Sequence, residues 1–304
     1  MSSAVAGDQS DREASARPGR DIAVARSSAA SDASMHNVMG QTIREVLNRR
    51  SDLSTFIVHF TRESATSTAA DNLRSIIRQR RIEARSCFGW GKDHAERLGG
   101  SDRDAQLCVC FSEAPVEHLY SLVADIAHRC VHLRPYGLAV TKMMARRRGA
   151  NPVWYVDMTP GHDWEQAKAL DALRDEAGRG SFVDHPAAKL FPFCEPMGTW
   201  HSRQREFWWE REWRRIGDYP LEKDEIAFWL CPEEEIESFE SFICEEWDLD
   251  ALAPDVRLKF GQRFVDPRWS VEEIIASLVG KDGTTPFSVR QVSHSKREQR
   301  PVSG

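Results

Sequence analysis

The sequence predicts an α+β fold, built on a mixed and largely antiparallel sheet with surrounding helices. Segments rich in β-branched and aromatic residues, which favour strands, are interspersed with amphipathic helical segments without a regular β-α-β order. The chain also lacks the G-x-G-x-x-G and G-x-x-x-x-G-K-[ST] patterns of dinucleotide-binding and P-loop folds. A doubly wound parallel sheet is therefore disfavoured.

One ordered domain is expected between two tails. The chain has 304 residues, of which 41% are hydrophobic and 29% charged, so a core of ordinary size can form. Residues 1–38 and 281–304 are dominated by small, polar and charged residues. Such segments bury too little apolar surface to offset the entropy lost on ordering, so both are predicted to be disordered. The single domain is expected to span residues 39–280.

Local patterns predict the elements of the first half of this domain. Leu73, Ile76 and Ile77 have the spacing of a buried helical stripe, which predicts a helix over 69–80. Pro115 suits the first turn of a helix whose buried stripe runs from Leu119 through Ile126 to Cys130. The other expected segments are a short helix at 40–48, strands at 56–60, 107–111 and 136–141, and a loop rich in glycine and charge at 89–103.

The second half is predicted in the same way. Asp163 is expected to cap a helix that reaches about residue 176. Residues 207–216 alternate strongly and predict one strand, and 153–156 and 225–230 predict two more. Ser270 and Glu273 have the spacing of a capping box before a final helix.

Charge and cysteine usage narrow the function classes. The net charge of −6 gives no global nucleic-acid signal, and the arginine groups at 74–85 and 146–148 are better explained as solvated helix faces than as a phosphate-binding groove. The seven cysteines lack zinc-site spacing, so we expect reduced thiols and no metal site. No apolar run has the length of a membrane helix and no signal-peptide layout is present, which predicts a cytoplasmic protein that does not bind a membrane.

Three short segments carry candidate binding residues. His59 ends an apolar strand and is followed by Thr61, so its imidazole could bond a ribose hydroxyl; a core histidine bonded to a backbone carbonyl is the favoured alternative. Ser112, where a strand leads into a helix, could position a phosphate or ribose, although Ser112 or Glu113 capping that helix is the stronger explanation. Tyr136 could stack on a flat ring, although such a tyrosine more often packs in the core.

A fourth segment, at 208–214, carries candidate catalytic carboxylates. Strand alternation would place four of its side chains on one face: Trp208, Glu210, Glu212 and Arg214. Two carboxylates in one partly buried row raise the pKa of one of them or recruit a cation. This is costly unless a site uses it, which favours a catalytic carboxylate. The alternative is a surface row in which Arg214 bridges Glu210 and Glu212 and contributes little to stability.

Taken together, these segments resemble the AbiGi-type abortive phage-resistance family from about residue 56 to about residue 278. The resemblance rests on the order and spacing of HFT at 59–61, LRSII at 73–77, VCFSEAP at 109–115, YG at 136–137, NPVWY at 151–155 and EREWR at 210–214. The same layout is similar to the ADP-ribosyltransferase fold, including DarT-like toxins that modify nucleic acid.

The resemblance implies roles for individual residues. NAD would be the substrate: His59 would contact its ribose, Ser112 would support the nicotinamide-ribose side, and Tyr136 would stack on nicotinamide. Glu212 would be the catalytic glutamate and Glu210 the upstream member of an E-x-E pair, although the sequence does not decide which of the two is catalytic. Thr61, in the same HFT segment, is grouped with the NAD-binding residues.

The function implied is NAD-dependent transfer of ADP-ribose to a nucleic acid or a host protein during abortive anti-phage defence. The alternative is a non-enzymatic antitoxin or partner-binding module that neutralises a cognate toxin, because AbiGi-type proteins are also described as antitoxins. A metal-dependent nuclease has less support, since no carboxylate and histidine set has metal-ligand spacing.

Overall fold

The computed structural model describes residues 52–125, 131–161, 163–200, 203–249 and 263–279. All of them belong to one compact unit, Gln41–Gly304. The two predicted tails, the predicted helix at 40–48 and the end of the stripe at Ile126 and Cys130 lie outside the described residues. In the part of the chain that is described, no helix is both long and apolar enough to cross a membrane.

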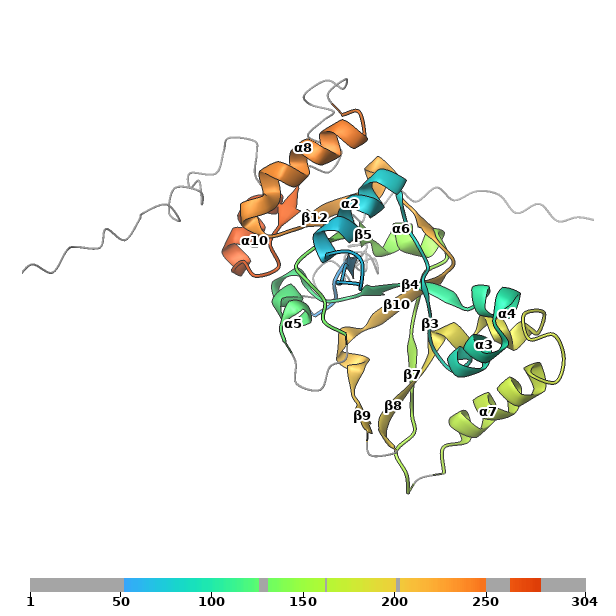
Figure 1. The fold of residues 1–304 in the computed structure, drawn as a ribbon. Coiled ribbons are helices and arrows are strands. Elements are labelled where there is room, and N and C mark those ends of the chain that lie inside the picture. Colours follow the sequence, from blue (N-terminus) through green and yellow to red (C-terminus); the bar gives the residue numbers. More distant parts are fainter. Residues whose placement is uncertain (1–51, 126–130, 162, 201–202, 250–262, 280–304) are drawn as a thin grey trace, which may run out of the picture. The chain divides into compact units, whose positions relative to one another are not determined.

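A mixed sheet forms the centre of the described residues (Figure 1). Its strand order is β13-β12-β5-β1-β4-β10-β6, and β3 pairs with β4 off this path. The strands pair antiparallel except β12 and β13, which are parallel, so the predicted α+β class with a largely antiparallel sheet is confirmed. The bounds are β1 (Phe56–Phe60), β3 (Ser86–Cys87), β4 (Leu107–Ser112), β5 (Gly137–Thr141), β6 (Asn151–Pro152), β10 (Glu212–Ile216), β12 (Ile226–Leu230) and β13 (Phe264–Val265).

Helices cover both faces of this sheet because successive strand residues point to opposite sides. On one side Ile57 packs with α2 (Ala69–Gln79), α6 (Lys142–Arg147) and α8 (Ile236–Glu246). On the other side Val58 packs with α5 (Leu119–Val123) and α10 (Val271–Val279). A buried apolar cluster on each side therefore holds the sheet between two layers of helices.

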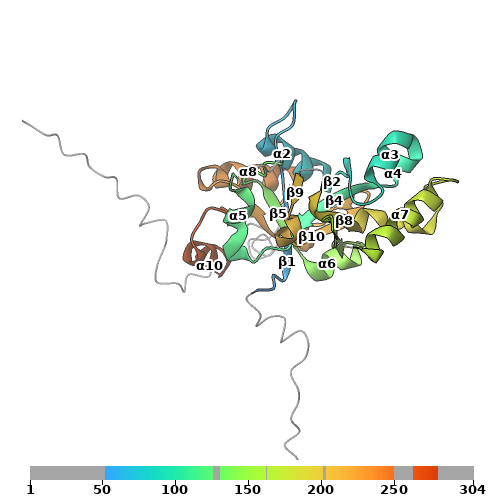
Figure 2. The same ribbon diagram turned by 90° about the horizontal axis from the view of Figure 1, so that it is seen from below.

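A second group of elements lies beside the main sheet (Figure 2). Strands β7 (Trp154–Asp157) and β8 (Cys194–Trp200) are parallel, and β9 (Arg203–Arg205) pairs antiparallel with β8. Val156 of β7 and Cys194 of β8 share a second buried cluster with α3 (Lys92–Leu98) and α7 (Glu165–Ala177). The remaining elements are α4 (Gly100–Asp104), the pair β2 (Arg81–Ile82) and β11 (Tyr219–Pro220), and the 3-10 turns η1 (Val116–His118), η2 (Pro186–Lys189), η3 (Phe191–Phe193), η4 (Phe207–Glu210), η5 (Lys223–Glu225) and η6 (Glu233–Glu235).

The arginines of α2 are structural. Arg74 lies 4.6 Å from the ring centre of Phe239, and Arg78 lies 5.4 Å from that of Phe242 and 2.9 Å from a carboxylate oxygen of Glu246. The aromatic and acidic side chains of α8 thus attach these two arginines to the fold, whereas Arg81 and Arg85 of the same basic group lie beyond α2.

Two predicted elements are wrong in part. Residues 89–103 contain α3 and α4 rather than a loop, because Ala95 packs in the second core and Gly99 separates two short helices. After Pro115 the chain forms a 3-10 turn, and α5 ends at Val123.

Two predicted details of helix and strand boundaries are also wrong. Asp163 does not cap α7: its carboxylate pairs with Lys168, and Trp164 is the N-cap residue. The expected strand at 207–216 begins only at Glu212, because residues 207–210 form η4. The capping box of the last helix is confirmed, since the Ser270 backbone N–H donates to Glu273 at 2.8 Å and the Glu273 N–H donates to the Ser270 hydroxyl at 3.3 Å.

Replacing Ile77 by alanine should test the main core. Ile77 is 0% exposed in α2, so Ile77→Ala should lower the free energy of unfolding by about 2–5 kcal/mol through lost burial and an unfilled cavity. The matched control is Ile275→Ala in α10, where the side chain is 54% exposed and the expected change is within about 0.5 kcal/mol. Urea denaturation measures both, and equal effects would contradict the described core.

Candidate functional site

The main sheet splits between β1 and β4. Within these described strands the two pair only at Val58 and Ser112, whereas β1 and β5 pair along their whole length. Beyond this point the His59 ring bridges the gap, with its Nδ1 atom 2.8 Å from the carbonyl oxygen of Cys110. The side chains and backbone at the ends of β1 and β4 are therefore exposed to a space between the strands instead of to a continuous ladder.

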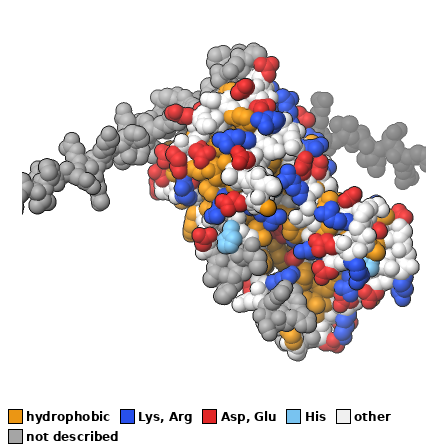
Figure 3. Space-filling model, viewed as in Figure 1, with side chains coloured by type: hydrophobic (Ala, Val, Ile, Leu, Met, Phe, Trp, Pro, Cys, Tyr) orange, Lys and Arg blue, Asp and Glu red, His pale blue; other side chains and the backbone are white. Residues whose placement is uncertain are grey.

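A pocket of about 730 Å³ occupies this split. Its volume lies within the range of about 300–1,000 Å³ that is usual for small-molecule and cofactor sites. The walls combine apolar side chains, including Phe60 and Phe88, with side chains of both charges, including Lys92 and Glu212. Hydrophobic surface lines the hollow in Figure 3, with charged side chains around it. Such a site suits a ligand that has both apolar rings and polar or charged groups.

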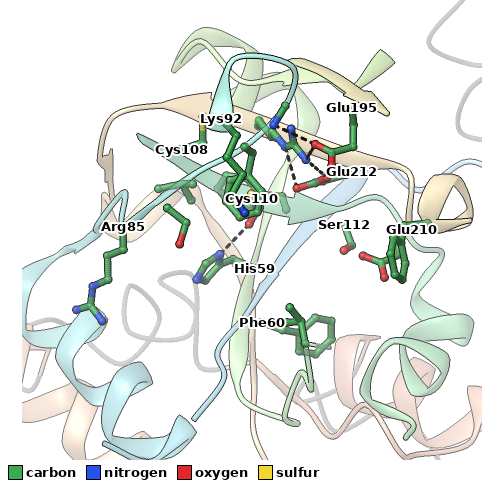
Figure 4. A pocket seen from close by; sticks show the side chains of 18 of the residues that line it. His59, Phe60, Arg85, Lys92, Cys108, Cys110, Ser112, Glu195, Glu210 and Glu212 are labelled. Atoms are coloured by element: carbon green, nitrogen blue, oxygen red, sulfur yellow. Dashed lines mark hydrogen bonds and ion pairs between the residues drawn. The ribbon is translucent and has the colours of Figure 1, made fainter. Parts of the chain in front are cut away.

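His59 lies in the middle of this pocket (Figure 4). Burial lowers its pKa from 6.5 to about 4, against the raising effect of the Cys110 carbonyl and with smaller lowering effects from Arg62 and Arg85. The ring is therefore neutral at neutral pH, so Nδ1 donates to the carbonyl and Nε2 must be a hydrogen-bond acceptor. The expectation of a histidine bonded to a backbone carbonyl is confirmed, and the same bond orients an acceptor for a ligand hydroxyl.

Arg214 forms the wall beside Glu212. Its guanidinium is almost fully buried, at 1% exposure, and donates to both carboxylate oxygens of Glu212 at 3.0 and 2.6 Å. It also pairs with Glu195 at 2.8 Å and donates to the Pro192 carbonyl at 2.6 Å. Burial lowers the pKa of Arg214, but Glu212 and Glu195 outweigh burial and hold that pKa well above its ordinary value.

The predicted row of charges is only partly present. Glu212 and Arg214 share a face of β10 as expected, but Arg214 bridges Glu212 to Glu195 of β8 and not to Glu210. Glu210 belongs to η4 and lines the pocket at the end that also contains Ser112 (Figure 4).

Arg211 forms the corner between η4 and β10. It has φ 48°, in the left-handed region, which costs a residue other than glycine about 1–3 kcal/mol. This corner, rather than strand alternation, directs Glu210 and Glu212 to the same pocket.

Of the other three predicted residues, two line the pocket and one does not. Thr61 lines the pocket but its hydroxyl donates to the backbone carbonyl of Ala69 at 2.8 Å. Ser112 also lines the pocket and does not cap a helix, because Pro115 precedes the 3-10 turn. Tyr136 lies outside the pocket lining, with its hydroxyl 2.6 Å from Glu235, so the packed interpretation holds for this residue. The structure thus brings together five of the six predicted residues.

Sequence patterns missed several pocket residues. Glu195 has no local signal, because it reaches Arg214 only through the pairing of β8 with β7. Tyr155 lines the pocket, and burial followed by the charge of Glu212 raises the pKa of its hydroxyl. Burial and then Glu212 also raise the pKa of the Cys110 thiol well above its ordinary value, so this cysteine is not a thiolate nucleophile at neutral pH.

Neither comparison with known proteins nor a search for metal-binding groups assigns a function to the pocket. Comparisons with protein-family models, with curated proteins and with solved structures found no match to this chain. In the described ranges, no group of three or more His, Cys, Asp or Glu side chains could hold a metal ion. The geometry of the pocket is therefore the main structural indication of function.

The pH dependence of stability should carry the signature of His59. The pKa of this histidine is near 6.5 in the unfolded chain but about 4 in the folded protein. Between these pH values the unfolded state binds more protons, so lowering the pH favours unfolding. Relative to His59→Gln, the wild type should lose free energy of unfolding as the pH falls from about 6.5 to about 4. Urea denaturation across this range measures the difference, and parallel curves for the two proteins would contradict the buried neutral ring.

Proposed function

We propose that this protein is an NAD-dependent ADP-ribosyltransferase that acts as an effector in abortive anti-phage defence and modifies a nucleic acid or a host protein. One observation carries the proposal: the pocket at the split between β1 and β4 collects His59, Thr61, Ser112, Glu210 and Glu212 from distant segments. These are five of the six residues for which the sequence resemblance implies contact with NAD or catalysis; the sixth, Tyr136, lies outside the pocket lining.

The pocket has the chemical groups that NAD requires. The Nε2 atom of His59 is a fixed acceptor, which suits a ribose hydroxyl. Arg62 and Lys92 also line the pocket and supply positive charge for a diphosphate, whereas Arg85 is already paired with Glu83 at 2.9 Å. Aromatic rings such as Phe88 provide surface for the flat bases.

The carboxylates suit the reaction itself. When the bond between the ribose carbon and the nicotinamide nitrogen breaks, nicotinamide leaves with the electron pair and positive charge develops on the ribose. Glu195 and Glu212 with Arg214 form a cluster of two negative charges and one positive charge, which leaves one net negative charge in the pocket wall. Glu210 adds a carboxylate at the same end as Ser112, where it could take the proton that the acceptor loses as it attacks.

Incubation with labelled NAD and whole-cell RNA, DNA and protein tests the activity. The wild type should release nicotinamide and label one class of acceptor. Loss of the carboxylate that opposes the developing cation should lower the rate about 100-fold, since a removed charge in such a site is worth about 3 kcal/mol. Glu212→Gln should therefore lose activity, and Glu210→Gln should lose activity because the group that takes the acceptor's proton is gone, both measured per folded molecule.

A stability control is required for Glu212. Because Arg214 loses a buried partner, Glu212→Gln should also lower the melting temperature. Glu225→Gln is the matched control: Glu225 is 4% exposed, pairs with Arg148 at 2.7 Å and lies outside the pocket lining. It should lower the melting temperature with normal activity per folded molecule. Normal activity per folded molecule in both pocket variants would end the catalytic proposal.

Expression of the chain alone separates the enzyme from the antitoxin alternative. An effector that consumes NAD and modifies host molecules should arrest growth, and the arrest should be relieved by Glu210→Gln. An antitoxin should be harmless when expressed alone and should protect cells only from a cognate toxin. Harmless expression of a folded wild-type chain would favour the antitoxin.

A further inference from the structure

Glu113 is a buried carboxylate with three donors. Its side chain is only 7% exposed, and it accepts from Lys142 at 2.6 Å, from Arg211 at 2.5 Å and from the indole N–H of Trp213 at 2.7 Å. The sequence interpretation of Glu113 as a helix cap is wrong, because its carboxylate is committed to these side chains and Pro115 precedes the following turn. Burying a carboxylate with two cations carries a desolvation penalty. Such a cluster therefore suggests that its geometry has a specific role.

The donors of Glu113 come from the corner that carries the pocket carboxylates. Arg211 and Trp213 alternate in sequence with Glu210 and Glu212. Glu210 and Glu212 line the pocket, whereas Arg211, Trp213 and Glu113 lie outside its lining. Glu113 therefore holds the residues next to each pocket carboxylate without touching the pocket.

The corner needs such an anchor. Arg211 has the left-handed φ of 48°, a conformation that persists in non-glycine residues only when the surroundings hold it in place. Besides Glu113, its side chain donates to the Asp52 carbonyl at 2.7 Å, and its own carbonyl accepts from the Glu113 backbone N–H at 3.2 Å. Glu113 thus binds Arg211 through a backbone hydrogen bond and through a side-chain ion pair.

We propose that Glu113 is a positioning residue that fixes the Arg211 corner and so sets the directions in which Glu210 and Glu212 enter the pocket. The effect on catalysis rests on the proposed transferase function, but the effect on the corner does not. A displacement of the reacting carboxylate by about 1 Å can lower a rate about 100-fold, so the loss of this anchor should be visible in kcat.

Glu113→Gln tests this role by hydrogen exchange and by kinetics. The glutamine keeps the volume but leaves the charges of Lys142 and Arg211 unpaired. Backbone amide exchange of residues 208–213 should become faster, while that of β12 should not change. The kcat for NAD cleavage, per folded molecule, should fall about 10- to 100-fold while KM for NAD changes little.

Two further variants separate positioning from stability. Glu225→Gln, which breaks a buried ion pair elsewhere, should lower the melting temperature without altering exchange at 208–213 or kcat. In Glu113→Gln/Lys142→Met the unpaired ammonium is gone, so the melting temperature should recover in part, while exchange at 208–213 stays fast because Arg211 still lacks its partner. This double variant also serves if the single variant does not fold.

The outcomes are distinct. Wild-type exchange at 208–213 in the Glu113 variants would overturn the inference, as would faster exchange with unchanged kcat in an active enzyme. If the wild type neither binds nor cleaves NAD, the proposed function fails, and the exchange measurement alone still decides whether Glu113 holds the corner.

Discussion

The buried guanidinium of Arg214 is the constraint on which the pocket depends. It projects from β10 of the main sheet and meets Glu195 of β8 and the Pro192 carbonyl of η3, so it joins the main sheet to the second group of elements, both of which line the pocket. Two carboxylates satisfy its charge and the ring of Phe88 covers it at 4.7 Å. Taking these charges out of water is unfavourable, and the loss of one partner from such a buried cluster typically costs about 3–5 kcal/mol. The walls are consequently held in one relative position.

A second charged cluster lies at the other side of the same strand. There the centre is a carboxylate, Glu113, and its donors include Arg211 and Trp213, whereas Glu212 and Arg214 belong to the first cluster. Residues 211–214, at the start of β10, are therefore held by contacts on both sides. Fixed side chains matter in a catalytic site, where a carboxylate must meet a transient charge without reorganising at the moment of reaction.

Local sequence patterns predicted the elements whose partners are defined by periodicity. The apolar strand β1, the helix α2 and the Ser270 capping box follow from spacing alone and are confirmed. The predicted strand at 207–216 is wrong in its first half. The alternation of aromatic and charged residues there fits a 3-10 turn followed by a strand as well as it fits one long strand. The structural roles of Glu195 and Glu113 could not be predicted from local patterns, since these roles arise from contacts with residues far away in the sequence. Tyr136 had a pattern compatible with stacking, but its partner Glu235 comes from a distant turn.

The pocket itself argues for a ligand. Protein interiors pack closely, and a core that needed only stability would fill the split between β1 and β4 with apolar side chains or close it with a continuous ladder. Here β1 leaves β4, a neutral His59 replaces the missing ladder contact, and charged groups are partly buried around the space. Each of these features opposes stability unless something binds there. A module that only presented an outer surface to a partner would not require them, so the pocket is the feature that most favours the uptake of a small ligand.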